Sequence, residues 1–340
     1  VLTTGNIINV ITKPGFGEAQ NPNHKNYTVI TSGAEFVDVV NNGKAGNYVI
    51  GNDITVENND TRAMTRAAAA PTTVIDLNGM TITAEAGATV VVANTLVLTG
   101  EGTLVGDADF IDNTNGKVIV AEEAKVNGVN EAVKDDTKIA NTADWLADVL
   151  ANGGEYVLTA DMTIAETDIT ATAPITIDGN NKTITTNGKG LRFQASNTVN
   201  INTVNIKNLT IVNASSEGRC IDTRVGNINL TLENVNLYTT HSASNTQPLT
   251  IGGKGNNINV TINNSAIEAG KSGYGIITFN PVALNINNSE ISGYAALYIK
   301  PGSAGSVINV VNSILEGINN AAQDESNSFA TVVTEDNDIT

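Results

Sequence analysis

The feature that most constrains the fold is a repeated block in the second half of the chain, with an asparagine at the same place in each copy. Five segments align, from IKNLTIVN at 206–213 to VVNSILEG at 310–317. Aliphatic residues stand four and two places before the asparagine and three places after it in every copy. Irregular internal repeats of this length are typical of solenoids, in which one loop per coil varies. The asparagines, at spacings of 26, 30, 24 and 24 residues, are Asn208, Asn234, Asn264, Asn288 and Asn312.

Period-2 alternation on both sides of each asparagine predicts a strand, a sharp turn and a second strand. The repeat therefore predicts an all-β chain folded as a parallel β-solenoid, with the aliphatic columns inside. Stacked one coil apart, about 4.8 Å, the asparagine side chains could bond to one another and to turn backbone. We expect this column to form a structural ladder inside the solenoid.

The aliphatic columns and the asparagine ladder resemble the right-handed parallel β-helix of the pectate-lyase-like superfamily. The resemblance covers roughly residues 174–320 and concerns the fold, because many unrelated activities use this scaffold. Members commonly close the first coil with a short helix, which covers core and unpaired strand edges.

A longer duplication predicts two such helices and two modules. The segments 36–55 and 145–163 each begin with an amphipathic stripe, end it at Asn-Gly, and continue into a Tyr-Val strand. We expect an extended entry arm at 1–26, a first short module at 27–130, a linker at 131–141 and a longer module at 142–340. The chain opens without an initiator methionine or signal peptide, so we interpret it as a mature fragment of something longer.

Composition and charge narrow the range of possible functions. Asparagine and threonine number 48 and 42 of 340 residues, whereas aromatic residues make up 4%. The net charge is −17 and basic residues do not cluster, which disfavours nucleic acid as a partner. No apolar run reaches membrane-spanning length. High Asn, Thr and Gly with low Lys resembles secreted bacterial surface proteins, so we expect an extracellular or cell-surface location.

The catalytic motifs that the resemblance would imply are missing. Polygalacturonase-like sites pair carboxylates with Gly-His-Gly and Arg-Ile-Lys segments, neither of which occurs here. Pectate-lyase-like sites place a Ca²⁺ cage of several acids beside an arginine, and only the segment 219–224, RCIDTR, brings an arginine near an acid on a solenoid strand. A single Asp is no cage, and a surface ion pair is the simpler interpretation.

One outer face offers a candidate ligand site. Inward Ile221, Leu249, Ile277 and Leu297 would stack in register, which would turn Asp222, Thr250, Thr278 and Tyr298 outward. Aromatic rings beside polar donors commonly hold sugars. The alternative is that tyrosines cover the solenoid corners. The candidate ligand-binding residues are Asp222, Arg224, Tyr298, Lys300 and Tyr274.

No cofactor or metal site is expected. His24 and His241 have no partner at metal-ligand spacing, and Cys220 has no nearby histidine that would make it a nucleophile. The acidic tail 334–338 could offer oxygens to Ca²⁺, but it lacks the glycine and the spaced final glutamate of a calcium loop.

Three functions remain to be weighed. The first is a noncatalytic, adhesin-like surface module that displays the solenoid, binds an extracellular glycan weakly or contacts a host or cell-surface protein. The second is a polysaccharide lyase or glycoside hydrolase with an unfamiliar site. Ice binding fails, because the Thr-x-Thr pairs at 81–83 and 183–185 do not recur coil after coil. We expect the surface module, without catalysis.

Overall fold

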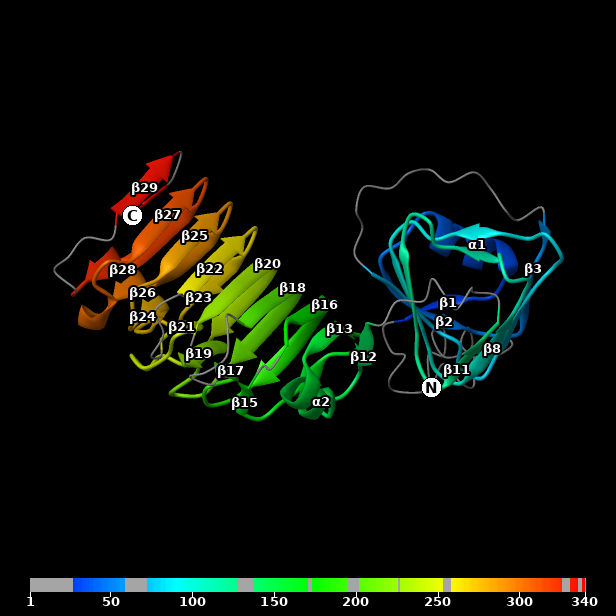
Figure 1. Cartoon of the computed structure of the whole chain (residues 1–340), viewed down its shortest axis with the longest axis horizontal. Coiled ribbons are helices and arrows are strands. Elements are labelled where there is room, and N and C mark those ends of the chain that lie inside the picture. The colour runs from blue at the N-terminus through cyan, green and yellow to red at the C-terminus, as the bar shows by residue number, and fades with distance from the viewer. Residues whose placement is uncertain are drawn as a thin grey trace, which may run out of the picture. The chain divides into compact units, whose positions relative to one another are not determined.

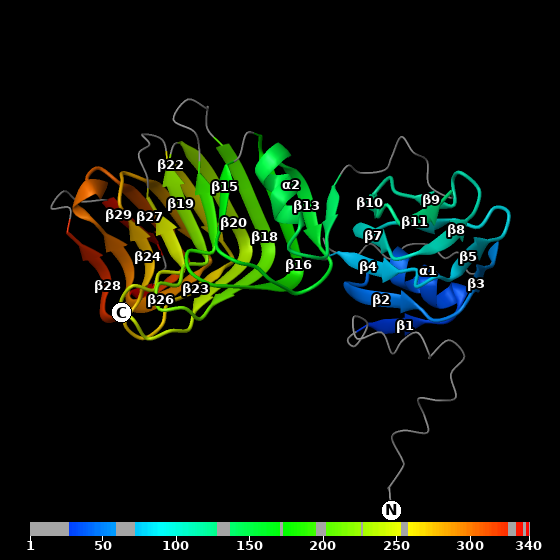
Figure 2. The same ribbon diagram turned by 90° about the horizontal axis from the view of Figure 1, so that it is seen from below.

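The structure is a computed structural model and describes residues 27–58, 72–127, 137–170, 173–194, 202–225, 227–252, 258–325, 331–335 and 338–339. The chain divides into two compact units, Val1–Lys138 and Ile139–Thr340, each with its own core. Both units are parallel β-solenoids (Figures 1 and 2). The predicted all-β solenoid fold is confirmed. The entry arm at 1–26 lies outside the described residues.

The first unit contains short coils. One sheet has the order β1-β2-β4-β7-β10, a second the order β11-β8-β5-β3, and a pair joins β6 to β9. Helix α1 (Gly33–Asn41) begins at Ser32, whose hydroxyl accepts a hydrogen bond from the backbone of Glu35, and it buries Phe36 against the core. The strands are β1 (Thr28–Ile30), β2 (Gly46–Ile50), β3 (Ile54–Val56), β4 (Thr73–Asp76), β5 (Thr81–Ala84), β6 (Val90–Val91), β7 (Thr95–Thr99), β8 (Gly102–Val105), β9 (Ile111–Asp112), β10 (Lys117–Val120) and β11 (Ala124–Val126).

The second unit is a longer stack that begins with β12 (Lys138–Ala140) and α2 (Trp145–Asn152), which lies beside the first coils (Figure 2). Its coils present three faces. The first face runs through β13 (Gly154–Leu158), the N-terminal halves of β16 (Ile175–Thr186), β18 (Asn202–Asn213) and β20 (Ile228–Thr239), and then β22 (Ile258–Asn263), β25 (Ala283–Asn287), β27 (Val307–Val311) and β29 (Thr331–Glu335).

The second and third faces come later in each coil. The second contains β14 (Met162–Thr163), the C-terminal halves of β16, β18 and β20, β23 (Ala266–Glu268), the starts of β26 (Glu290–Ile299) and β28 (Ile314–Asp324), and β30 (Asp338–Ile339). The third contains β15 (Thr167–Thr170), β17 (Leu191–Gln194), β19 (Ile221–Val225), β21 (Leu249–Ile251), β24 (Tyr274–Thr278) and the ends of β26 and β28. A 3₁₀ turn, η5 (Pro301–Ser303), follows β26.

The aliphatic columns lie inside in the predicted register. Val204 pairs with Leu230, and the column continues through Val260, Leu284 and Ile308, all at most 1% exposed. The columns that begin at Ile206 and Ile211 are buried in the same way. The spacing around the asparagines therefore predicted the core of this unit residue by residue.

The expectation that the asparagine column lies inside is wrong. Asn234, Asn264, Asn288 and Asn312 are exposed and Asn208 is half-buried. Each has a positive φ, from +47° to +55°, and lies at the bend between the first and second faces. Asparagine tolerates this left-handed conformation better than most residues, so the column supplies the corner of each coil through its backbone. Some side-chain stacking remains, since Asn234 donates to Asn208 at 2.9 Å.

A buried polar ladder does exist, one position after the asparagine, and it is made of serine. The hydroxyls of Ser289 and Ser313 each accept a hydrogen bond from the backbone N–H of the serine one coil earlier, at 3.1 Å. Each hydroxyl also donates to a carbonyl two residues back, at 2.7 Å. Both serines are at most 5% exposed, so these bonds satisfy backbone groups that the bend would leave unpaired.

A substitution at Asn288 tests the role of the corner. We expect Asn288→Val to lower the free energy of unfolding by about 2 kcal/mol, because a β-branched residue is strained at positive φ. Asn288→Gly should cost less than about 1 kcal/mol, since glycine adopts this conformation freely. Urea denaturation measures both values. Equal losses would mean that the asparagine side chain, and not its backbone conformation, stabilises the corner.

Candidate functional site

The third face of the second unit carries the candidate site. Its outward column runs from Arg192 through Asp222, Thr250 and Ile277 to Tyr298, each paired with the next coil. The inward column passes through Ile276, not Ile277 as predicted, so the predicted register is one residue out in β24. Two adjacent isoleucines made the alternation ambiguous there, and pairing with Leu249 and Leu297 selects Ile276.

Asp222 is buried, which contradicts its predicted exposure on the outer face. Its side chain is 1% exposed because two arginines cover it. Arg219 donates from Nη1 to Oδ2 at 2.7 Å, and Nε of Arg192 lies 3.8 Å from the same oxygen. The predicted partner Arg224 lies in β19, but its side chain lies outside the described residues.

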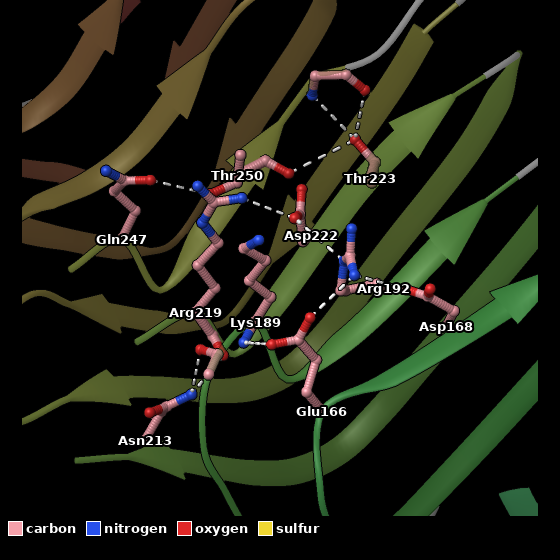
Figure 3. Close-up of polar contacts among 12 residues, drawn as sticks. Glu166, Asp168, Lys189, Arg192, Asn213, Arg219, Asp222, Thr223, Gln247 and Thr250 are labelled. Carbon is pink, nitrogen blue, oxygen red and sulfur yellow. Dashed lines mark hydrogen bonds and ion pairs between the residues drawn. The ribbon is translucent and has the colours of Figure 1, made fainter. Parts of the chain in front are cut away.

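The ion-pair network extends beyond Asp222, as Figure 3 shows. Arg192 also contacts the carboxylates of Glu166 at 2.8 Å and Asp168 at 2.9 Å. Glu166 accepts a further hydrogen bond from the backbone of Lys189. The network ties β15, β17 and β19 together across three coils. We missed Arg192 and Glu166 in the sequence because they are 26 residues apart and become neighbours only through stacking.

The tyrosine cluster lies farther along the same face. The rings of Tyr274 and Tyr298 lie 4.3 Å apart between centroids, and Tyr294 contacts Tyr274 edge-on at 6.0 Å. The ammonium of Lys300 lies 3.9 Å from the centroid of Tyr298, and the hydroxyl of Tyr298 donates to Glu325 at 2.7 Å. The structure therefore brings three of the five predicted ligand residues, Tyr274, Tyr298 and Lys300, into contact.

The contacts in this cluster cover the ring of Tyr298. The side chain is 6% exposed, and Tyr274 and Lys300 both pack against its ring. Tyr298 is therefore a packing residue and does not present an open ring to a ligand. Burial raises the pKa of Tyr274, and its electrostatic interaction with Tyr298 adds to the effect. Burial alone would lower the pKa of Lys300, but its hydrogen bond to Tyr298 and the charge of Glu325 outweigh it and raise that pKa.

A groove of about 520 Å³ lies between the ion-pair network and the tyrosine cluster. We call it the aromatic groove. Phe279, directly after β24, is 40% exposed and provides the open ring that Tyr298 does not. The sequence reasoning missed Phe279 because it stands in a turn, outside the alternating strands. The groove is lined by Lys189, Glu217, Arg219, Ser244, Asn245, Gln247, Tyr274, Ile277, Phe279, Tyr298 and Lys300.

Metal and nucleophile chemistry find no support in the described part of the chain. It contains no group of three or more His, Cys, Asp or Glu side chains placed to hold a metal ion. Burial raises the pKa of the Cys220 thiol, which is completely buried, and this opposes formation of a nucleophilic thiolate. His241 is exposed and accepts a hydrogen bond from the backbone of Ala243. His24 and the side chains of 334–338 lie outside the described residues.

Comparisons with known proteins add no relative. No protein-family profile matches the sequence, and no match was found among curated proteins or solved structures. Within the described residues, no helix has the length and apolar character needed to cross a membrane.

The buried carboxylate generates a prediction about stability. We expect Asp222→Asn to lower the free energy of unfolding by about 3 kcal/mol, because it leaves the largely buried guanidinium group of Arg219 without its counter-charge and removes one of the three carboxylates around Arg192. Asp168→Asn is the matched control, since Asp168 pairs with the same Arg192 but is half exposed, and it should cost less than about 1 kcal/mol. Urea denaturation gives both values. Similar losses in the free energy of unfolding would show that the burial of Asp222 does not increase its contribution to stability.

Proposed function

We propose that this chain is a noncatalytic, adhesin-like module of a secreted or cell-surface protein, and that the aromatic groove binds a glycan weakly. The observation that carries the proposal is the exposed ring of Phe279, which lines the same groove as Asn245, Gln247 and Lys189. An aromatic ring packs on the apolar face of a sugar, while amides and charges bond to its hydroxyls.

The alternative is a polysaccharide lyase or glycoside hydrolase. A glycosidase of the usual kind needs two carboxylates facing the scissile bond. Among the described residues that line the groove, Glu217 is the one carboxylate, and Arg219 is held by Asp222. These observations favour binding over catalysis. A right-handed coil and kinship with the pectate-lyase-like superfamily are part of the proposal, supported by the aliphatic columns and the repeated asparagine at the bend.

Substitution of Phe279 tests the groove. A single sugar on so open a surface should bind near millimolar, about −4 kcal/mol, and avidity would come from many copies on one surface. Phe279→Ala should weaken binding about tenfold, because the lost apolar contact is worth roughly 1.4 kcal/mol. Affinity chromatography on a panel of immobilised glycans measures the retardation of each variant.

Val307→Ala is the matched control, because Val307 is 47% exposed but lies on the first face. It should be retarded as strongly as the parent chain. Equal retention of Phe279→Ala on every glycan, or no retention of the parent by any glycan, would remove the aromatic groove as a binding site.

A further inference from the structure

A second groove, of about 610 Å³, lies on the same unit and is not involved in the proposed glycan binding. It crosses the ends of β20 and β23 and the middle of β26 and β28, so it spans four successive coils. Small residues, Ala269, Gly270, Ser292 and Gly293, are part of its lining. We call it the acidic groove, and its other lining residues are Tyr238, Thr239, Thr240, Glu268, Lys271, Glu316 and Ile318.

Negative charge gathers along this groove. Glu268, Ser292 and Glu316 stack in one outward column, and Glu290 stands in the neighbouring column. No ion pair or side-chain hydrogen bond joins any of these three glutamates to another described residue. Burial raises the pKa of Tyr238, and the negative charges of Glu268 and Glu290 raise it further. Like charges on neighbouring strands are destabilising unless a partner compensates them.

Exposed aliphatic surface accompanies the charge. Ile318, at 66%, is the most exposed of the large hydrophobic side chains in the described residues, and it forms part of the groove lining. Ile314, in the outward column beside Glu290, is 41% exposed. Aliphatic side chains favour an aliphatic partner, whereas the aromatic groove offers the ring that sugars prefer. The two grooves therefore suit different ligand classes.

The spacing suits an extended chain. Glu268 and Glu316 are two coils apart, which is about 9.6 Å at about 4.8 Å per coil. In an extended polypeptide, side chains two and four positions apart point to the same face, at separations of about 6.7 Å and 13.4 Å. Basic side chains four positions apart would therefore reach the two carboxylates by leaning inward along their flexible stems. An aliphatic side chain midway between them would face the groove and reach Ile318.

We propose that the acidic groove docks an extended polypeptide segment that carries two basic side chains four residues apart with an aliphatic residue midway between them. The carboxylates of Glu268 and Glu316 pair with the basic groups, and Ile318 packs against the aliphatic side chain. This interaction is independent of the proposed glycan binding, because the grooves share no lining residue.

Fluorescence polarisation with the full chain tests the proposal. The probe is a labelled peptide Gly-Lys-Ser-Ile-Ser-Lys-Gly, blocked at its C-terminus, and the comparison peptide has glutamate in place of both lysines. We expect the lysine peptide to bind and the glutamate peptide not to bind. The Glu268→Gln/Glu316→Gln double variant should bind the lysine peptide about five- to tenfold more weakly at low salt, with most of this difference lost near 1 M salt, where charges are screened.

Three further variants separate the apolar and electrostatic contributions to peptide binding. Ile318→Ser should weaken binding about threefold at all salt concentrations, because its contact is apolar. Lys271→Gln should strengthen binding about twofold, since it removes the one cation of the described lining. Glu101→Gln/Glu122→Gln is the matched control, with the same charge change at exposed positions of the first unit, and it should bind as the parent does.

Several results would overturn the proposal. One is equal binding of the lysine and glutamate peptides, and another is a double variant that binds as tightly as the control. Binding of a glucosamine oligomer through the same carboxylates, with no binding of the lysine peptide, would assign the groove to a cationic glycan instead. The gain expected for Lys271→Gln cannot arise from misfolding, so its absence would also count against the proposal.

Discussion

Parallel pairing between successive coils is the constraint on which the second unit depends. Each strand of the first face pairs with the next without a break from β18 to β27, which keeps every aliphatic column in one line. The same pairing keeps the bend at one place in every coil, so the left-handed corner falls on an asparagine each time. Once the register is set, side chains 24 to 30 residues apart in the sequence become neighbours. The ion-pair network and both grooves are consequences of that stacking.

The sequence predicted those parts of the fold that repeat. Val204, Ile206 and Ile211 and their counterparts lie inside as the alternation required. The asparagine column was found by the same reasoning, but its location was wrong. A repeated asparagine has two physical explanations, a buried amide ladder or a backbone at positive φ, and the spacing alone does not distinguish them. The buried polar ladder is instead formed by the serines that stand one position after the asparagines.

The candidate site was less predictable, because it depends on loops and on which of two adjacent residues faces inward. Ile276 and Ile277 fit the inner column equally well until the pairing with Leu249 is known. Asp222 was recognised as an ion-pair residue, but its burial depends on Arg192 from the preceding coil. Tyr298 was predicted as a stacking platform, but neighbours from its own and adjacent coils cover it. Phe279 follows the end of a strand, where periodicity carries no information.

The central functional claim is that the aromatic groove binds sugar without cleaving it. The most direct measurement applies a glycan array and a reducing-end assay to one purified sample of the full chain. The account predicts retention on at least one glycan and no new reducing ends or unsaturated products from that glycan after prolonged incubation. Product formation would contradict it and would favour a polysaccharide lyase or glycoside hydrolase.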